Sequence, residues 1–143
     1  MNEVRGIVLR PNGEREWFAM DKDDWQELDS VLGCRVFTSV RPFAGNQYAE
    51  QVSIFVDDEG LLHPDSVGNI WSCVICPIFE IPQILFGNIV LLGGADEFGD
   101  VTDLHGEIVN LLPPSMRPSP EMQIRFQITL DTTRDRGHPC GTP

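Results

Sequence analysis

The sequence predicts an α+β domain, with a mixed or antiparallel sheet of five to six strands packed by two short helices. Short apolar runs alternate with polar residues between Gly, Pro and Asn turns, as in strands. Two other stretches place apolar residues at helical spacing. Of the 143 residues, 41% are apolar and 22% charged, which is ordinary for a folded protein. We expect residues 1–112 to form one domain, and 113–143 a Pro-rich linker, an amphipathic strand and a frayed tail.

A β-hairpin is expected at the start of the chain. Strand-like residues 6–10 and 14–19 flank Pro11-Asn12-Gly13. Asn-Gly readily adopts the positive φ angles of tight turns, so this spacing predicts two antiparallel strands.

The next element is predicted to be a helix over residues 21–32. Asp21 is a suitable N-cap, and further aspartates follow it in the first turn, where the helix dipole favours negative charge. Gly33 can end the helix in the left-handed conformation. The apolar stripe of this helix consists of Trp25, Leu28, Val31 and Leu32.

Three further strands are predicted, over residues 34–41, 48–56 and 88–92. In the second of these, Val52, Ile54 and Val56 are expected to point into the core.

Two more segments concern helices. A second helix is expected over residues 105–112, before Pro113-Pro114. Residues 69–81 are apolar all round, so periodicity leaves a buried strand and a short helix both open. In either case Pro77 and Pro82 are expected to end the element.

The last predicted strand covers residues 122–130. Its apolar positions alternate without interruption, which indicates a half-buried or edge strand: Met122, Ile124, Phe126, Ile128 and Leu130. An amphipathic strand after a Pro-rich linker is compatible with strand exchange, so a homo-oligomer through this strand is one possibility.

The charge distribution is the strongest indication of function. The net charge is −12, Lys22 is the single lysine, and no lysine or arginine occurs between Arg41 and Arg117. Such a field repels nucleic acids and anionic membranes and attracts basic protein surfaces. We therefore expect a protein partner with a basic surface, with no direct nucleic-acid binding and no membrane association. The expected partner-binding residues are Asp57, Asp58, Glu59, Asp96, Glu97, Asp100 and Asp103.

These carboxylates lie in two turns, 57–59 and 96–103. They form one anionic rim only if both turns lie at the same edge of the sheet. At opposite edges, mimicry of a nucleic acid loses its main support. No apolar stretch is long enough to cross a bilayer and no secretory signal is visible, so a cytoplasmic location is expected.

No catalytic constellation is apparent, and we predict no catalytic residues, no cofactor and no metal. Cys73 and Cys76 could join His138 and Cys140 in a zinc site. The residues between the first two cysteines are apolar rather than turn-forming, which favours buried structural thiols instead. An alternative function uses the arginines: Arg10, Arg35 and Arg41 could line a pocket in an oligomeric sponge that sequesters an anionic nucleotide signal.

Four segments occur in a characteristic order. They are IVLRPNG at 7–13, the helical stretch 25–33 running into 36–42, VDDEGLL at 56–62 with Asn69 after it, and FGNIVLLGG at 86–94 followed by an acidic turn and Thr102-Asp103-Leu104. This order resembles a small, functionally uncharacterised domain family found in bacteria, phages and plasmids, over residues 5–112.

The resemblance carries over no catalytic residues. It implies a small accessory protein of a mobile element, and with the cytoplasmic location expected above this protein would act in the host cell. Together with the acidic field, it leads us to expect a non-enzymatic protein that binds and inhibits a host defence or regulatory protein.

Overall fold

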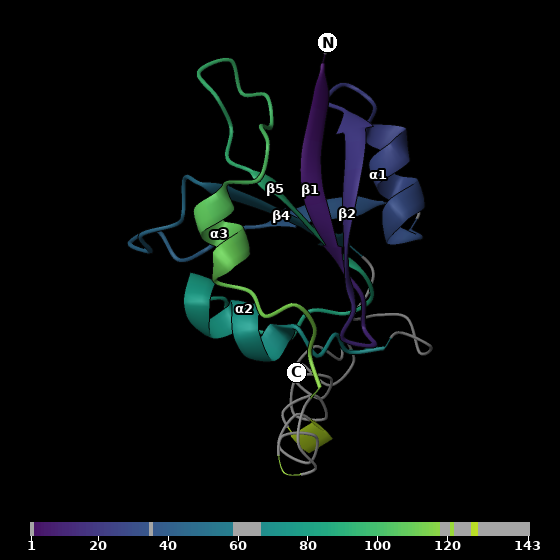
Figure 1. Ribbon diagram of the computed structural model, residues 1–143, viewed down its shortest axis with the longest axis vertical. Coiled ribbons are helices and arrows are strands. Elements are labelled where there is room, and N and C mark those ends of the chain that lie inside the picture. The colour runs from purple at the N-terminus through teal and green to yellow at the C-terminus, as the bar shows by residue number, and fades with distance from the viewer. Residues whose placement is uncertain (1, 35, 59–66, 118–120, 122–126, 129–143) are drawn as a thin grey trace, which may run out of the picture.

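The computed structural model describes residues 2–34, 36–58, 67–117, 121 and 127–128 (Figure 1). Its sheet has five strands in the order β2-β1-β5-β4-β3, and all neighbouring strands are antiparallel. The strands are β1 (Glu3–Leu9), β2 (Arg15–Asp21), β3 (Phe37–Val40), β4 (Val52–Asp57) and β5 (Ile89–Gly93), and the helices are α1 (Trp25–Leu32), α2 (Ser72–Phe79) and α3 (Gly106–Asn110). The α+β prediction is confirmed, with an antiparallel sheet and one short helix more than expected.

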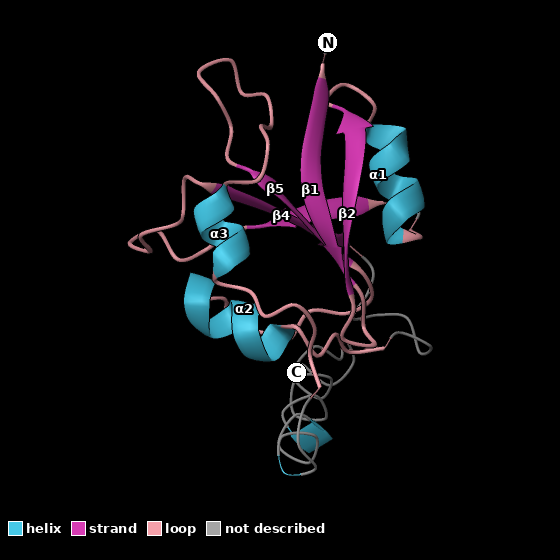
Figure 2. Cartoon of the chain, in the orientation of Figure 1, coloured by secondary structure: helices cyan, strands magenta, loops and turns pink. Residues whose placement is uncertain are grey.

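Both faces of the sheet are buried under helices, as Figure 2 shows. Ile7 and Leu9 of β1 pack with α2 and α3 on one face, whereas Val4 and Val8 of the same strand pack with α1 on the other. This division follows from the two-residue period of a strand. The central strand β5 is buried at every position, which explains its continuous apolar sequence.

The opening hairpin forms as predicted. The Arg10 N–H donates to the Glu14 carbonyl at 2.9 Å, and Gly13 has a φ of 94° in the connecting loop. The loop therefore uses the left-handed conformation that glycine adopts without a steric cost.

Helix α1 begins later than predicted. Asp24, not Asp21, is the N-cap, and its Oδ1 accepts the Glu27 N–H at 3.3 Å. Asp21 is the last residue of β2, and its side chain accepts the Asp23 N–H in the turn that follows. Several aspartates in succession offered equivalent capping groups, so composition alone misplaced the start. Gly33, with φ 66°, ends the helix as predicted.

The segment that could have been a strand or a helix is α2, and Pro77 lies inside it. The prediction that Pro77 ends the element was wrong, because the helix continues to Phe79 and ends where Glu80 adopts a φ of 55°. Ile75 and Phe79 are fully buried against the sheet. This packing on both sides of Pro77 holds the helix together despite the missing N–H.

The remaining elements occur where they were predicted, but β3, β4 and α3 are shorter than expected and β5 is shifted by one residue. The inward residues Val52, Ile54 and Val56 of β4 lie in the core, and α3 falls within the predicted range 105–112. Most of the predicted strand 122–130 is outside the described residues. At its two described positions, Gln127 and Ile128, the backbone is helical and exposed rather than extended.

Candidate interaction surface at the acidic end of the sheet

The two acidic turns lie at opposite ends of the sheet. Strands β4 and β5 are antiparallel, with Val52 opposite Gly93 and Phe55 opposite Val90. The turn after Asp57 therefore leaves the sheet where β5 begins, and the acidic loop 94–103 leaves it where β4 begins. The single anionic rim is not formed, so mimicry of a nucleic acid loses its main support. Glu59 falls outside the described residues.

A different set of carboxylates gathers around loop 94–103. This loop and the turn between β2 and α1 both emerge at the end of the sheet where β1 begins, near the N-terminus at the top of Figure 1. Lys22 Nζ joins them by an ion pair to Asp100 Oδ2 at 2.9 Å. We call this region the acidic end, and its carboxylates are Asp21, Asp23, Asp24, Asp96, Glu97, Asp100 and Asp103.

The raised pKa of Lys22 reflects the negative electrostatic field at the acidic end. Its hydrogen bond to Asp100 and the charge of Asp100 raise its pKa above the usual 10.5, and Asp23 and Asp96 raise it further. Carboxylates of both loops therefore act on one ammonium group. The chain has no second lysine, and the described part of the acidic end is strongly anionic.

Loop 94–103 is an ordered turn that presents an exposed aromatic ring. Asp96 Oδ1 accepts the N–H groups of Phe98 at 2.8 Å and Asp100 at 3.0 Å, and Gly99 has a φ of 81°. In such a turn, the aspartate side chain accepts hydrogen bonds from backbone N–H groups a few residues later in the chain, which fixes the turn. Phe98 is 80% exposed between Glu97 and Gly99. An exposed aromatic side chain among charged residues is typical of an anchor residue in a protein–protein interface.

Several of the carboxylates also have internal roles. Asp103 Oδ1 accepts the Arg5 N–H at 2.8 Å, Asp24 caps α1, and Asp100 pairs with Lys22. Within the described part of the chain, the side chains of Asp23 and Glu97 have no hydrogen bond. These two carboxylates can be changed without removing a bond that supports the loops.

The sequence reasoning found loop 94–103 but missed Phe98 and the aspartates after β2. The sequence pattern places those aspartates in the first turn of a helix. The available signal was the run Asp21-Lys22-Asp23-Asp24, which places several charges directly after a predicted strand. What could not be read from the sequence was the strand order that brings this run beside loop 94–103.

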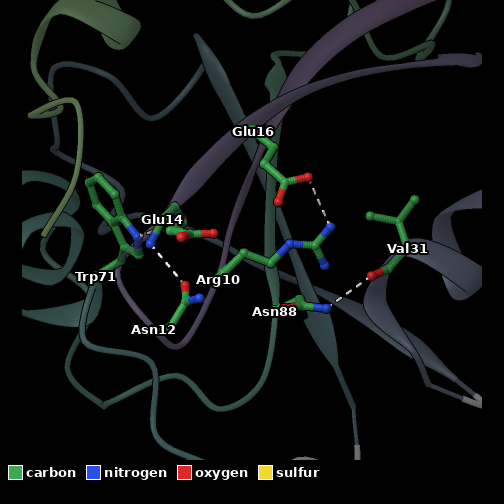
Figure 3. A network of polar contacts seen from close by, with 7 residues as sticks. All are labelled: Arg10, Asn12, Glu14, Glu16, Val31, Trp71 and Asn88. Atoms are coloured by element: carbon green, nitrogen blue, oxygen red, sulfur yellow. Dashed lines mark hydrogen bonds and ion pairs between the residues drawn. The ribbon is translucent and has the colours of Figure 1, made fainter.

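The arginines of the alternative site are not brought together. Arg10 Nη2 lies 3.3 Å from Glu16 Oε2, next to the connecting turn of the hairpin (Figure 3). The strand directions place Arg10, after β1, and Arg41, after β3, at opposite ends of the sheet. Arg35 is outside the described residues. The described arginines therefore give no shared anion pocket.

Cys73 and Cys76 lie on α2 as free thiols. Burial raises the pKa of both, that of Cys76 to about 12, and the Cys76 thiol donates to the Gln83 carbonyl at 3.2 Å. A zinc ligand must be a thiolate, which this environment disfavours. His138 and Cys140 are not among the described residues. Across the described ranges, no group of three or more His, Cys, Asp or Glu side chains could hold a metal.

The fold and the surface define a small α+β domain with an ordered acidic end. In the described part of the chain, no helix is both long and apolar enough to span a bilayer. A family model described as a domain of unknown function (DUF3846) matches residues 4–113, and the chain belongs to this family. The resemblance to an uncharacterised family is thereby confirmed. No curated protein and no solved structure gives a significant match.

Proposed function

We propose that this chain is a non-enzymatic binding protein whose acidic end engages a basic surface on a partner protein. In this proposal it is an accessory protein of a phage or other mobile element in the host cytoplasm, and the partner is a host defence or regulatory protein that it inhibits. The observation that carries the proposal is the exposed Phe98 at an ordered turn beside carboxylates of two loops. Aromatic anchors supply affinity and surrounding charges speed association and select the partner.

The test measures binding with the acidic end altered. The variant Asp23→Lys/Glu97→Lys reverses two charges that carry no internal hydrogen bond, and Phe98→Ala removes the proposed anchor. Proteins captured from a host lysate by the wild-type chain should be retained at low salt and released as the salt concentration rises. Both variants should lose them at low salt.

A matched control reverses two charges at the other end of the sheet. Glu14→Lys/Asp58→Lys gives the same net charge as the acidic-end variant, and both of its positions are exposed. It should retain the captured protein. Loss of binding in both charge variants would assign the effect to net charge alone, and capture that is indifferent to salt and to Phe98 would contradict the proposal.

A further inference from the structure

Strand β2 leaves its outer backbone edge open. It is the first strand in the sheet order, and among the described strands β1 is its one partner. The pair is hydrogen-bonded at Arg10 with Glu14 and at Lys22 with Asn2, so the even-numbered residues of β2 bond to β1. In agreement, the Arg5 N–H and carbonyl bond to Asp103 and Leu104, on the side away from β2. The N–H groups of the odd-numbered residues Arg15, Trp17, Ala19 and Asp21 therefore point outward. The C=O groups of Arg15, Trp17 and Ala19 do the same, whereas the Asp21 carbonyl accepts the Asp24 N–H at 2.9 Å.

An open edge of seven residues is a template for another strand. Native proteins commonly blunt such an edge with lysine or proline, and β2 contains neither. Instead it exposes Trp17, which is 61% exposed although it lies opposite the buried Ile7 in the hairpin. The edge thus combines unpaired backbone with an uncovered aromatic side chain.

The sequence of β2 is complementary to itself in one register. Exchange of hydrogen bonds requires odd-numbered residues to face odd-numbered residues. Antiparallel pairing centred on Phe18 meets this requirement and uses the whole strand. It places Arg15 opposite Asp21 of the second copy and Trp17 opposite Ala19 of the second copy. Because the pairing is symmetric, each of these pairs occurs twice. A large residue beside a small one favours this alignment. Arg15, whose Nη1 donates to the Val109 and Leu112 carbonyls of its own chain, also brings a positive charge opposite Asp21.

We infer that two copies of this chain associate through β2, by antiparallel pairing centred on Phe18. The two five-stranded sheets then form one continuous sheet of ten strands with a two-fold axis at Phe18. Both Phe18 side chains lie on the face covered by α1 and meet across the axis. Since β2 runs in opposite directions in the two copies, the two acidic ends point away from each other. Each dimer then presents both acidic ends, which strengthens binding to any partner with two basic sites.

The first test measures molar mass in solution. Light scattering or sedimentation equilibrium on the full chain should give twice the 16.0 kDa of one chain at micromolar concentration. Ala19→Pro removes an N–H that points to the open edge and leaves the bonds to β1 in place. We expect the dimer dissociation constant to rise about tenfold or more, because the symmetric interface loses two hydrogen bonds. The exposed hairpin substitution Asn12→Ala is the control and should leave the dimer unchanged.

The second test fixes the register and does not depend on how Ala19→Pro folds. In this pairing the two copies of residue 18 are a directly opposed, non-hydrogen-bonded pair about 4.5 Å apart at Cα, within reach of a disulfide. Phe18→Cys should therefore cross-link into a covalent dimer on mild oxidation, and Ala19→Cys, which faces residue 17 of the other copy, should not. A wild-type chain that remains monomeric at 100 μM would overturn the inference. So would cross-linking of both variants to the same extent, or a dimer unaffected by a folded Ala19→Pro chain.

Discussion

At the residue scale, Asn69 holds three parts of the fold together. It is fully buried, and its Nδ2 donates to the Leu9 and Gly87 carbonyls, both at 2.8 Å. Its Oδ1 accepts the Trp71 N–H at 2.9 Å. One amide side chain therefore supplies hydrogen-bond partners to backbone groups in three places: the end of β1, the chain before β5 and the start of α2. A buried amide with all of these bonds in place costs little, whereas its removal leaves the backbone groups unsatisfied.

We predict that Asn69→Ala lowers the free energy of unfolding by about 2–4 kcal/mol, because two carbonyls and one N–H lose their partner in a buried site. Urea denaturation followed by circular dichroism measures this change. Asn12→Ala is the matched control. Asn12 is exposed and makes a single bond, to the Glu14 N–H at 3.0 Å, so its loss should cost roughly 0.5–1 kcal/mol. Equal losses in the two variants would contradict the role assigned to Asn69.

At the element scale, the chain shows which structure can be read from a sequence. The hairpin and α1 have a clear period, turn residues and a glycine terminator, and both were predicted. Helix α2 has apolar residues on every side, so neither period is visible in it. Its helical state comes from packing of Trp71, Ile75 and Phe79 in the core, which local sequence does not encode. The same packing explains why Pro77 failed as a stop signal.

We predict that Pro77→Ala stabilises the protein. Pro77 is exposed on α2, and its missing N–H leaves the Cys73 carbonyl without the bond that a helix normally supplies. Alanine restores this donor and is the best helix former, so the free energy of unfolding should rise by about 1 kcal/mol or more. Thermal denaturation should show an increase in Tm of about 3 °C.

Pro82→Ala provides the comparison for Pro77, since Pro82 lies after the helix and outside any described element. It should leave the Tm unchanged or slightly lower, because the unfolded chain gains freedom and no helical bond forms. A Pro77→Ala chain that melts below the wild type would show that the proline ring itself contributes to packing on α2.

At the scale of the whole molecule, the strand order determines which charged residues lie close together. Asp58 and loop 94–103 both lie outside the strands as expected, but antiparallel pairing of β4 with β5 places them at opposite ends of the sheet. The pairing of β1 with both β2 and β5 brings Asp21, Asp23 and Asp24 toward loop 94–103, where Lys22 joins the two segments. Relations between segments so distant in sequence depend on topology, for which the local pattern carries no signal.

The negative charge concentrated at the acidic end should make stability depend on salt. Repulsion among exposed carboxylates destabilises the folded state, and salt screens it. Raising NaCl from 10 to 300 mM should therefore increase the Tm by about 2–4 °C, equivalent to roughly 1 kcal/mol.

The acidic-end variant Asp23→Lys/Glu97→Lys changes the net charge from −12 to −8, since each reversal adds two units. It should melt higher than the wild type at 10 mM NaCl and respond less to added salt. The opposite-end variant Glu14→Lys/Asp58→Lys has the same net charge and should keep more of the wild-type response. If the two variants respond equally, the repulsion is spread over the whole surface and the acidic end has no special field.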